Sequence, residues 1–368
     1  MEKARRIKLG ILFGGRSGEH EVSIRSAASV IEALDPSEYD IKVIGITKTG
    51  MLASAAETGG MLPPATRGRV TLCETNAGDG HQVQLLPDAS QADRVHHDQP
   101  EIIFPLLHGP YGEDGTIQGL LEIAGLPYVG CGVLASAVGM DKDVMKRLYV
   151  QAGLPVLPFR VVRCNEISGT VDRLAGELER DFGYPMFSKP ANLGSSVGVC
   201  KIHSRRELAD ALAFSAQFDR KVIVEKGIDA RELECAILGN DRPQASIVGE
   251  IIPAREYYDY QAKYADPDSR LEIPAPIPAD KAGEIQSIAV RAFELIDGSG
   301  LARVDFFMER KTGAIWLNEI NTMPGFTPIS MYAKLWAASG VDFPALIRSL
   351  VRLGLERHAE RRAFRVSG

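Results

Sequence analysis

Strand-length apolar runs alternate with helical patterns along the first third of the chain, and this alternation constrains the fold more than any other feature. Strand-like runs occupy Ile7–Phe13, Ile41–Ile46 and Ile102–Leu107, whereas Val22–Leu34 and Gln118–Ala124 repeat apolar residues with helical spacing. Strands that alternate with helices favour a doubly wound α/β domain, in which a mostly parallel sheet carries helices on both faces. We therefore predict such a domain for residues 1–140.

Two further groups of strands predict two more domains, at residues 141–238 and 239–368. The second group combines helices with short strands, at Lys142–Ala152, Pro185–Pro190, Val197–Ile202, Arg205–Phe214 and Val222–Glu225. The third group contains strands at Ala245–Ile252, Ala302–Glu309 and Ala314–Ile320. Between strands lies the Pro- and charge-rich segment 257–278, and so long a connection inside a compact domain is usually functional or disordered. The predicted fold class is α/β with α+β character, in three domains.

The charge and cysteine content exclude several classes of protein. Lys and Arg total 42 against 48 Asp and Glu, and the net charge of -6 gives no reason to expect nucleic acid or an anionic membrane as partner. No apolar stretch reaches about 18 residues, so we expect no transmembrane helix. Scattered cysteines without a CxxC motif argue against disulfides or zinc and favour the cytoplasm. We expect loops and a hairpin at residues 51–99, and a solvated basic tail at 357–368.

Two polar motifs in the third domain predict a metal site. Side chains alternate between the two faces of a strand, so Arg303 and Asp305 point the same way. Glu319 and Asn321 share a face for the same reason, and the four converge if the two strands form a hairpin. Two carboxylates and an amide oxygen suit Mg²⁺, and Arg303 would neutralise a phosphoryl group during its transfer. The alternative is a solvated polar face of an antiparallel sheet.

A glycine-rich loop after a strand-end lysine predicts a phosphate site. Lys189 is followed by small residues whose backbone N–H groups can approach phosphates closely, at Gly194, Ser195, Ser196 and Gly198. The segment is neither GxxxxGK[ST] nor GxGxxG, so it is not one of the two common nucleotide loops. The alternative is an ordinary hairpin with a glycine-rich turn.

The strand at Val222–Glu225 runs into a turn whose exposed backbone could pair with an adenine edge. Glu232 follows this turn and could take ribose hydroxyls. A plain edge strand explains the segment equally well when it is considered alone.

Three loops place ionisable groups or backbone donors at the ends of strands and helices. Glu19 follows the first strand, where open α/β sheets bind ligands, and could hold an ammonium group; helix capping is the alternative. His108 opens a second strand-end loop, although a histidine after an apolar strand is more often structural. Gly325 can offer a backbone N–H to an oxyanion, and Ser330 lies near a helix start that favours a carboxylate.

These motifs together resemble the D-alanine–D-alanine ligases, from Lys8 to about Leu353. The matching segments are GGRSGEHEVSI, LHGPYGEDGTIQG, SKPANLGSSVGV, VEKGIDARELECAILG, YYDYQAKY, ARVDFF and LNEINTMPGFTPIS. The resemblance implies an ATP-grasp fold that holds ATP between the central and C-terminal domains. It also implies that two D-alanines are joined through an acylphosphate, for peptidoglycan precursor synthesis.

The resemblance further implies which residues contact ATP and metal. The implied ATP contacts are Lys142 and Lys189 at the phosphates, Glu225, Lys226 and Ile228 at the adenine, and Glu232 at the ribose. The implied ligands of two Mg²⁺ ions, which Mn²⁺ could replace, are Asp305, Glu319 and Asn321. Phosphoryl transfer needs positioning and charge neutralisation more than a protein nucleophile, and none is expected here.

Substrate contacts are implied in the same way. Glu19 would hold the ammonium of the first D-alanine near His108, while Ser195 and Tyr264 would link to Glu19. The resemblance implies that Arg303 and the Gly325 N–H stabilise the tetrahedral intermediate. It implies that Ser330 and Met331 bind the second carboxylate. The segment 257–278 would be a lid that excludes water, because an exposed acylphosphate hydrolyses.

Four alternatives stay open beside this interpretation. Ligases that make D-alanyl-D-lactate typically carry a His where this chain has Lys263-Tyr264, so Tyr264 favours the dipeptide product. The sequence discriminates poorly against a D-alanyl-D-serine ligase. A different ATP-grasp carboxylate–amine ligase is disfavoured by the Glu19 and His108 loops. A non-catalytic nucleotide-binding regulator would be favoured by the loss of a magnesium ligand or of Lys189, and this chain keeps all of these residues. The expected partners are D-alanine and ATP, and the family implies a homodimer.

Overall fold

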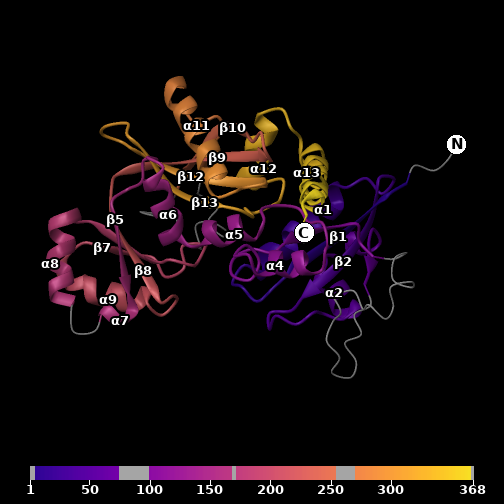
Figure 1. Ribbon diagram of the computed structural model, residues 1–368, viewed down its shortest axis with the longest axis horizontal. Helices are drawn as coiled ribbons and strands as arrows, with labels where there is room; N and C mark the ends of the chain where they lie inside the picture. The colour runs from indigo at the N-terminus through magenta and orange to yellow at the C-terminus, as the bar shows by residue number, and fades with distance from the viewer. Residues whose placement is uncertain (1–4, 74–98, 168–170, 254–269, 366–368) are drawn as a thin grey trace.

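The structure, a computed structural model, describes residues 5–73, 99–167, 171–253 and 270–365, and these residues form three sheets (Figure 1). The N-terminal sheet has the strand order β3-β2-β1-β4, and every pair in it is parallel. Its elements are β1 (Ile7–Gly14), α1 (His20–Ala33), β2 (Tyr39–Ile46), α2 (Ala55–Met61), α3 (Pro64–Arg67), β3 (Thr71–Leu72), β4 (Ile102–Leu106) and α4 (Thr116–Ile123). The predicted mostly parallel sheet is confirmed.

Helices cover both faces of the N-terminal sheet, because the side chains of its central strand alternate. Leu9 and Ile11 of β1 point into a core shared with α1 and with the C-terminal helix. Leu12 points the other way and packs against Ile117 and Leu121 of α4. This two-sided burial is what the strand–helix alternation of the sequence predicts for a doubly wound sheet.

The central sheet is antiparallel, in the order β5-β8-β6-β7. Its elements are β5 (Phe159–Arg163), α7 (Cys164–Ile167), α8 (Val171–Phe182), β6 (Met186–Pro190), β7 (Cys200–Ile202), α9 (Arg205–Ser215) and β8 (Lys221–Lys226). Alternate residues of β8 and β6, Val224 and Ser188 among them, face α8 and α9. The intervening residues Lys189 and Glu225 therefore face away from these helices, toward the third sheet.

The C-terminal sheet is also antiparallel, in the order β11-β10-β9-β12-β13. Its elements are β9 (Ala230–Gly239), β10 (Gln244–Ile252), β11 (Arg270–Glu272), α11 (Ala279–Leu295), β12 (Gly300–Glu309) and β13 (Ile315–Asn321). One face packs against α5 (Val133–Met140), α6 (Lys142–Gln151) and α11. The hairpin that would bring the two polar motifs together is observed as the antiparallel pair β12–β13, whereas strand β9 was not predicted.

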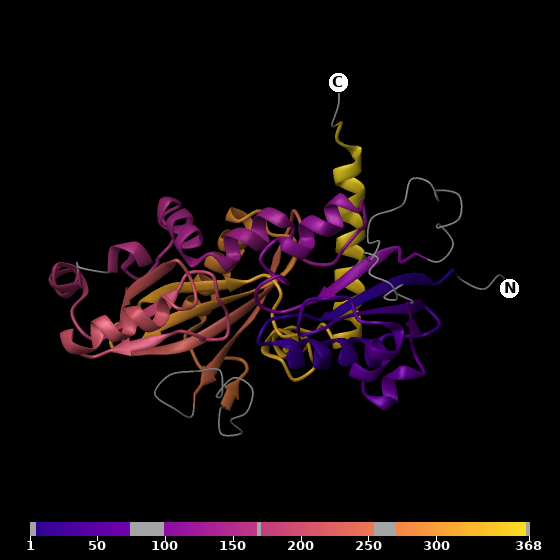
Figure 2. The ribbon, with the colours of Figure 1, turned by 90° about the horizontal axis from the view of Figure 1, so that it is seen from below.

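The last two helices return the chain to the N-terminal sheet. They are α12 (Met331–Ala338) and α13 (Phe343–Ala363), and α13 lies along the N-terminal sheet in both ribbon views (Figures 1 and 2). Gly354 allows this approach, because a Cβ at that position would lie 2.7 Å from the carbonyl oxygen of Tyr128. A boundary after residue 238 would cut the end of β9, so we propose a domain boundary just before Ala230 instead.

Two expectations about irregular segments need correction. Residues 55–67 form the helices α2 and α3 instead of loops, and residues 74–98 lie outside the described part of the chain. The expected solvated tail is helical as far as Ala363. Arg357 of this helix stacks on the Tyr128 ring at 4.1 Å and donates to Ser299 Oγ at 2.9 Å, so tertiary contacts order a segment that is poor in apolar residues.

All five cysteines are unpaired in the structure. Within the described ranges, no helix combines the length and the apolar composition that crossing a bilayer requires.

Candidate active site

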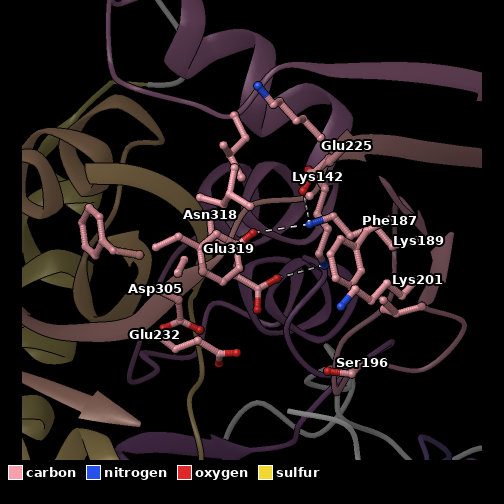
Figure 3. A pocket seen from close by; sticks show the side chains of 18 of the residues that line it. Lys142, Phe187, Lys189, Ser196, Lys201, Glu225, Glu232, Asp305, Asn318 and Glu319 are labelled. Atoms are coloured by element: carbon pink, nitrogen blue, oxygen red, sulfur yellow. Dashed lines mark hydrogen bonds and ion pairs between the residues drawn. The ribbon is translucent and has the colours of Figure 1, made fainter. Parts of the chain in front are cut away.

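A cavity of about 570 Å³ opens between the central and the C-terminal sheets (Figure 3). Strands β6 and β8 supply one wall, and β9, β12 and β13 supply the other. All six residues expected to contact ATP line this cavity: Lys142, Lys189, Glu225, Lys226, Ile228 and Glu232. Asp305 and Glu319, two of the three expected metal ligands, line it as well. The fold thus gathers on one cavity residues that lie up to 177 positions apart, from Lys142 to Glu319.

A buried carboxylate between two lysines forms part of the first wall. Glu225 Oε2 lies 2.8 Å from Lys189 Nζ, and Glu225 Oε1 lies 2.9 Å from Lys146 Nζ. Burial alone would raise the pKa of Glu225, but the two ammonium groups outweigh it and lower this pKa to about 2. Both oxygens of the Glu225 carboxylate therefore contact lysines. If this strand contacts an adenine, the contact would be made by the backbone of the turn that follows Glu225.

Helix α6 directs two lysines toward the cavity region. The carboxylate of Asp141 caps the helix by accepting from Asp143 N at 3.1 Å and from Val144 N at 3.2 Å. One turn separates Lys142 from Lys146, so both lie on the same face. Lys142 Nζ donates to the Leu193 carbonyl at 2.8 Å and lies 3.4 Å from Glu319 Oε2. Lys146 was missed, although its four-residue spacing from Lys142 on an expected helix was a usable signal.

The opposite wall presents the expected polar face of the β12–β13 hairpin. In the register of this hairpin, Asp305 pairs with Glu319 and Arg303 pairs with Asn321. Both Asp305 oxygens accept from the Arg303 guanidinium, at 2.7 and 2.6 Å, and Asn321 Nδ2 donates to Asp305 Oδ2 at 3.1 Å. Glu234 of β9 adds a second carboxylate 2.9 Å from Arg303. Burial lowers the pKa of Arg303, but the adjacent carboxylates of Asp305 and Glu234 raise it by more. The net shift is upward, so the guanidinium stays charged.

The donor set of this wall fits a divalent cation. Asp305 and Glu319 offer carboxylate oxygens from directly paired positions, and Asn321 offers an amide oxygen beside them. Mg²⁺ takes such oxygen ligands and completes its shell with water and phosphate oxygens. Among the described residues, no group of three or more His, Cys, Asp or Glu side chains is gathered for a metal.

A β-bulge adds a residue that the sequence did not single out. Glu319 pairs with Asp305 while Leu317 pairs with Phe306, so Asn318 is left without a partner in the ladder. The bulge turns Asn318 toward the cavity, where its Oδ1 accepts from Lys189 Nζ at 3.4 Å. A bulge interrupts strand alternation, and strict alternation would have placed Asn318 on the core face.

The glycine-rich loop reaches from the cavity to the N-terminal domain. Ser195 and Ser196 both have left-handed backbone, with φ of 53° and 57°, an unusual conformation for residues other than glycine. Ser195 Oγ donates to Glu19 Oε1 at 2.5 Å, which is the link implied by the resemblance. Glu19 precedes α1 without capping it through its side chain, so the alternative of helix capping by Glu19 is not observed.

His108 is buried and holds two loops together. Its Nδ1 lies 3.0 Å from the Met323 carbonyl, which can only accept, so Nδ1 carries the proton. Its Nε2 lies 3.0 Å from Ser26 Oγ and accepts from that hydroxyl. Burial lowers the pKa of His108, and this effect outweighs the charge of Glu19, which would raise it. The ring is therefore neutral. The ring thus contacts the loop that follows β13 through Nδ1 and helix α1 through Nε2.

Glu113 is a buried carboxyl that the sequence analysis named only as part of its loop. Its Oε1 accepts from Gly109 N at 2.9 Å, and a Cβ built on Gly194 would lie 3.9 Å from it. Burial, and secondarily the charge of Glu19, raise the pKa of Glu113 to about 8. The carboxyl is therefore protonated at neutral pH, next to the Ser195–Glu19 contact.

The remaining expected residues lie around the loop between β13 and α12. Gly325 approaches Ser330, whose Oγ would be 3.4 Å from a Cβ at position 325. Ser330 precedes α12, and its Oγ accepts from Thr327 N at 3.1 Å. The side chain of Met331 is part of the hydrophobic core, so a carboxylate at this helix start would meet its backbone N–H. Tyr264 and the first part of the expected lid lie outside the described residues.

Family models cover most of the chain. Residues 8–131 match the model described as D-ala D-ala ligase N-terminus, and residues 148–352 match that described as D-ala D-ala ligase C-terminus. The chain belongs to the D-alanine–D-alanine ligase family. Members of this family use ATP and divalent metal ions, in agreement with the lysines and carboxylates that face each other across the cavity.

Individual relatives agree with this membership. The chain is 48% identical over 360 residues to a D-alanine–D-alanine ligase of Heliobacterium modesticaldum, and 96% of each chain is covered. A D-alanine–D-alanine ligase of Acetivibrio thermocellus is 46% identical over 361 residues, which cover 95% of this chain and 96% of the relative.

Solved structures share the ATP-grasp architecture. The D-alanine–D-alanine ligase from Coxiella burnetii superposes with a TM-score of 0.79 at 34% identity, covering 98% of this chain and 97% of that one. The VanG D-Ala:D-Ser ligase from Enterococcus faecalis also gives a TM-score of 0.79, at 33% identity, covering 95% of this chain and all of that one. Backbone similarity alone therefore does not separate the two acceptors.

Proposed function

We propose that this protein joins two D-alanines with ATP, through an acylphosphate of the first, and so supplies the dipeptide for peptidoglycan precursors. One observation carries the proposal. The cavity sets Lys142 and Lys189 opposite Asp305 and Glu319, and the Ser195–Glu19 contact lies at the end of its glycine-rich loop. That arrangement provides cations for phosphates, carboxylates for a metal and a carboxylate for an ammonium group.

The roles of these residues follow from where they lie. Lys142 and Lys189 would bind phosphate oxygens, and Glu232 on β9 would accept from ribose hydroxyls. We propose two Mg²⁺ ions on Asp305, Glu319 and Asn321, with Mn²⁺ as a substitute; when bound, they would draw negative charge from the phosphates. Arg303, held by two carboxylates, would remain charged and stabilise the anion that forms when the acylphosphate is attacked.

The substrate side would be shaped by three loops. Glu19 would take the ammonium of the first D-alanine, and Ser195 fixes the orientation of its carboxylate. His108 would act mainly by holding the loop that carries Gly325, whose N–H would meet the oxyanion. The backbone at Ser330 and Met331 would receive the second carboxylate at the start of α12. Tyr264 and the lid at 257–278 remain expectations from sequence.

The test is phosphate release from ATP by the purified protein with Mg²⁺. We expect D-alanine alone to support turnover and mass spectrometry to show the dipeptide. D-serine or D-lactate in excess beside limiting D-alanine tests the acceptor, and L-alanine is the negative control. A mixed product that outweighs D-alanyl-D-alanine would reassign the acceptor, and ATP that is bound but never hydrolysed would favour a regulator.

We also propose a cytoplasmic homodimer. ATP is a cytoplasmic substrate, and the unpaired cysteines suit a reducing compartment. Two neighbouring helices carry exposed apolar side chains, with Ile123 on α4 75% exposed and Leu134 on α5 59% exposed. Light scattering on the purified protein should give twice the chain mass, and a monomer at micromolar concentration would refute the dimer.

A further inference from the structure

Lys146 is a buried cation that does not line the cavity. Its side chain is 1% exposed, and its ammonium lies 2.9 Å from one oxygen of Glu225. The other oxygen of that carboxylate lies 2.8 Å from Lys189, which does line the cavity. One buried carboxylate thus serves two lysines, one on the cavity side and one behind it (Figure 3 labels Glu225 and Lys189).

Charge balance alone requires only one of the two lysines. A buried ion pair is neutral, and removing one partner from it leaves an uncompensated buried charge, which is strongly unfavourable. If Glu225 had Lys189 as its single partner, a phosphate could attract Lys189 only by stripping that carboxylate of its counter-charge. With Lys146 behind it, Glu225 keeps a cation while Lys189 turns to the ligand.

We propose that Lys146 is a positioning residue that neutralises Glu225 and thereby leaves the Lys189 ammonium available to the phosphates of ATP. The inference rests on the proposed role of Lys189 as a phosphate ligand. Lys146 touches neither nucleotide nor metal; it acts through the carboxylate. The neighbouring helix residues Met145 and Tyr149 pack in the hydrophobic core, so Lys146 is held among buried side chains beside the carboxylate that it contacts.

The protonation of Lys146 is compatible with this task. Burial lowers the pKa of Lys146 to about 8, with Glu225 opposing the shift, so most of the ammonium remains charged at neutral pH. Lys189 has a second contact in the cavity, the 3.4 Å approach to Asn318 Oδ1, which shows that its ammonium already faces the space where phosphates would lie.

The experiment compares nucleotide binding in the parent protein and two variants by calorimetry, without D-alanine. Lys146→Met keeps the length of the side chain and removes its charge, and we expect ATP affinity to fall by about tenfold or more. Lys146→Met combined with Glu225→Gln removes both charges and frees Lys189 again, so affinity should return to within about threefold of the parent protein. Adenosine, which lacks phosphates, should bind all three proteins equally.

Two comparisons guard against a merely structural effect. Lys42→Met makes the same chemical change at a buried lysine in β2, away from the cavity, and should leave ATP affinity unchanged. Glu225→Gln alone removes the carboxylate through which Lys146 is proposed to act, so adding Lys146→Met to it should cost no further ATP affinity. This comparison decides the matter even if Lys146→Met alone does not fold, because a further loss in the double variant would show that Lys146 acts independently of Glu225.

The outcomes separate this inference from the proposed function. Failure of the double variant to recover affinity, or equal losses for ATP and adenosine, would overturn the role of Lys146. An unaltered ATP affinity in Lys146→Met would do the same. If the parent protein bound no ATP at all, the proposed function itself would fail. If the parent bound and hydrolysed ATP while the variants matched it, only the present inference would fall.

Discussion

Replacing Glu113 by Gln should stabilise the protein increasingly as the pH rises. In the folded chain this carboxyl is buried, and its Oε2 has no hydrogen-bond partner among the described residues. Burial and the nearby Glu19 raise the pKa of Glu113 from 4.5 to about 8. A group whose pKa is raised on folding contributes its stability below the unfolded-state pKa and loses it as the pH rises through the folded-state value. Gln mimics the protonated carboxyl and never ionises.

The size of the effect follows from the two pKa values. Between about pH 5 and about pH 7 the parent protein should lose about 2.5 kcal/mol relative to the variant, and about 1 kcal/mol more by about pH 9. The difference develops mainly between the two pKa values, so most of it is present by about pH 7 and the rest appears as the pH passes about 8. A gain of this size corresponds to a thermal midpoint that is higher by roughly 2–10 °C in the variant.

Thermal and urea unfolding of both proteins, in buffers of equal ionic strength across this range, would measure the difference. Glu294→Gln on α11 is a matched control, because that side chain is exposed and the same substitution should give a difference that does not depend on pH. A constant difference between Glu113→Gln and the parent protein from about pH 5 to about pH 9 would show that the carboxyl is ionised in the fold, and would refute the reasoning.

Three other predictions follow from the cavity and from α13. Glu319→Gln and Arg303→Lys should each lower turnover by about 100-fold or more without changing far-ultraviolet circular dichroism, because the first removes a carboxylate charge from the proposed metal site and the second removes the guanidinium proposed to stabilise the anion; near-normal turnover would contradict the assigned roles. Removing divalent ions with EDTA should stop phosphate release and added Mg²⁺ should restore it, whereas activity that persists in EDTA would exclude the metal site. Gly354→Ala should lower the thermal midpoint, since its Cβ would meet the Tyr128 carbonyl oxygen at 2.7 Å. Gly119→Ala, which meets open space in α4, should instead gain up to about 1 kcal/mol, and equal effects of the two substitutions would contradict the packing argument.

Local periodicity made part of the site predictable. Side chains in a strand alternate, so the positions of Arg303, Asp305, Glu319 and Asn321 on one face required only that two nearby strands form a hairpin. The same rule located Lys189 at the end of a strand before a glycine-rich loop. These features depend on residues close together in the chain, where spacing alone fixes direction.

Other parts of the site depend on contacts between distant segments. Nothing near Lys146 in the sequence indicates that Glu225 will lie beside it, and the burial that raises the pKa of Glu113 comes from loops of different domains. Asn318 escaped prediction because a bulge breaks the alternation on which the sequence argument relied. Strand β9 carried a usable alternation, with the acidic Glu232 and Glu234 alternating with the apolar Leu233 and Cys235, but its sheet neighbours β10 and β12 could not be inferred from it.

The sequence by itself determined the strand–helix alternation of the N-terminal domain, the hairpin that carries the carboxylates and the family to which the chain belongs, because repeating patterns and motifs are local properties. Tertiary structure decided which side chains meet across the cavity, which carboxyl holds its proton, and where the basic end of α13 rests. Those outcomes are set by burial and by charges at a few ångströms, and both exist only once distant segments have packed together.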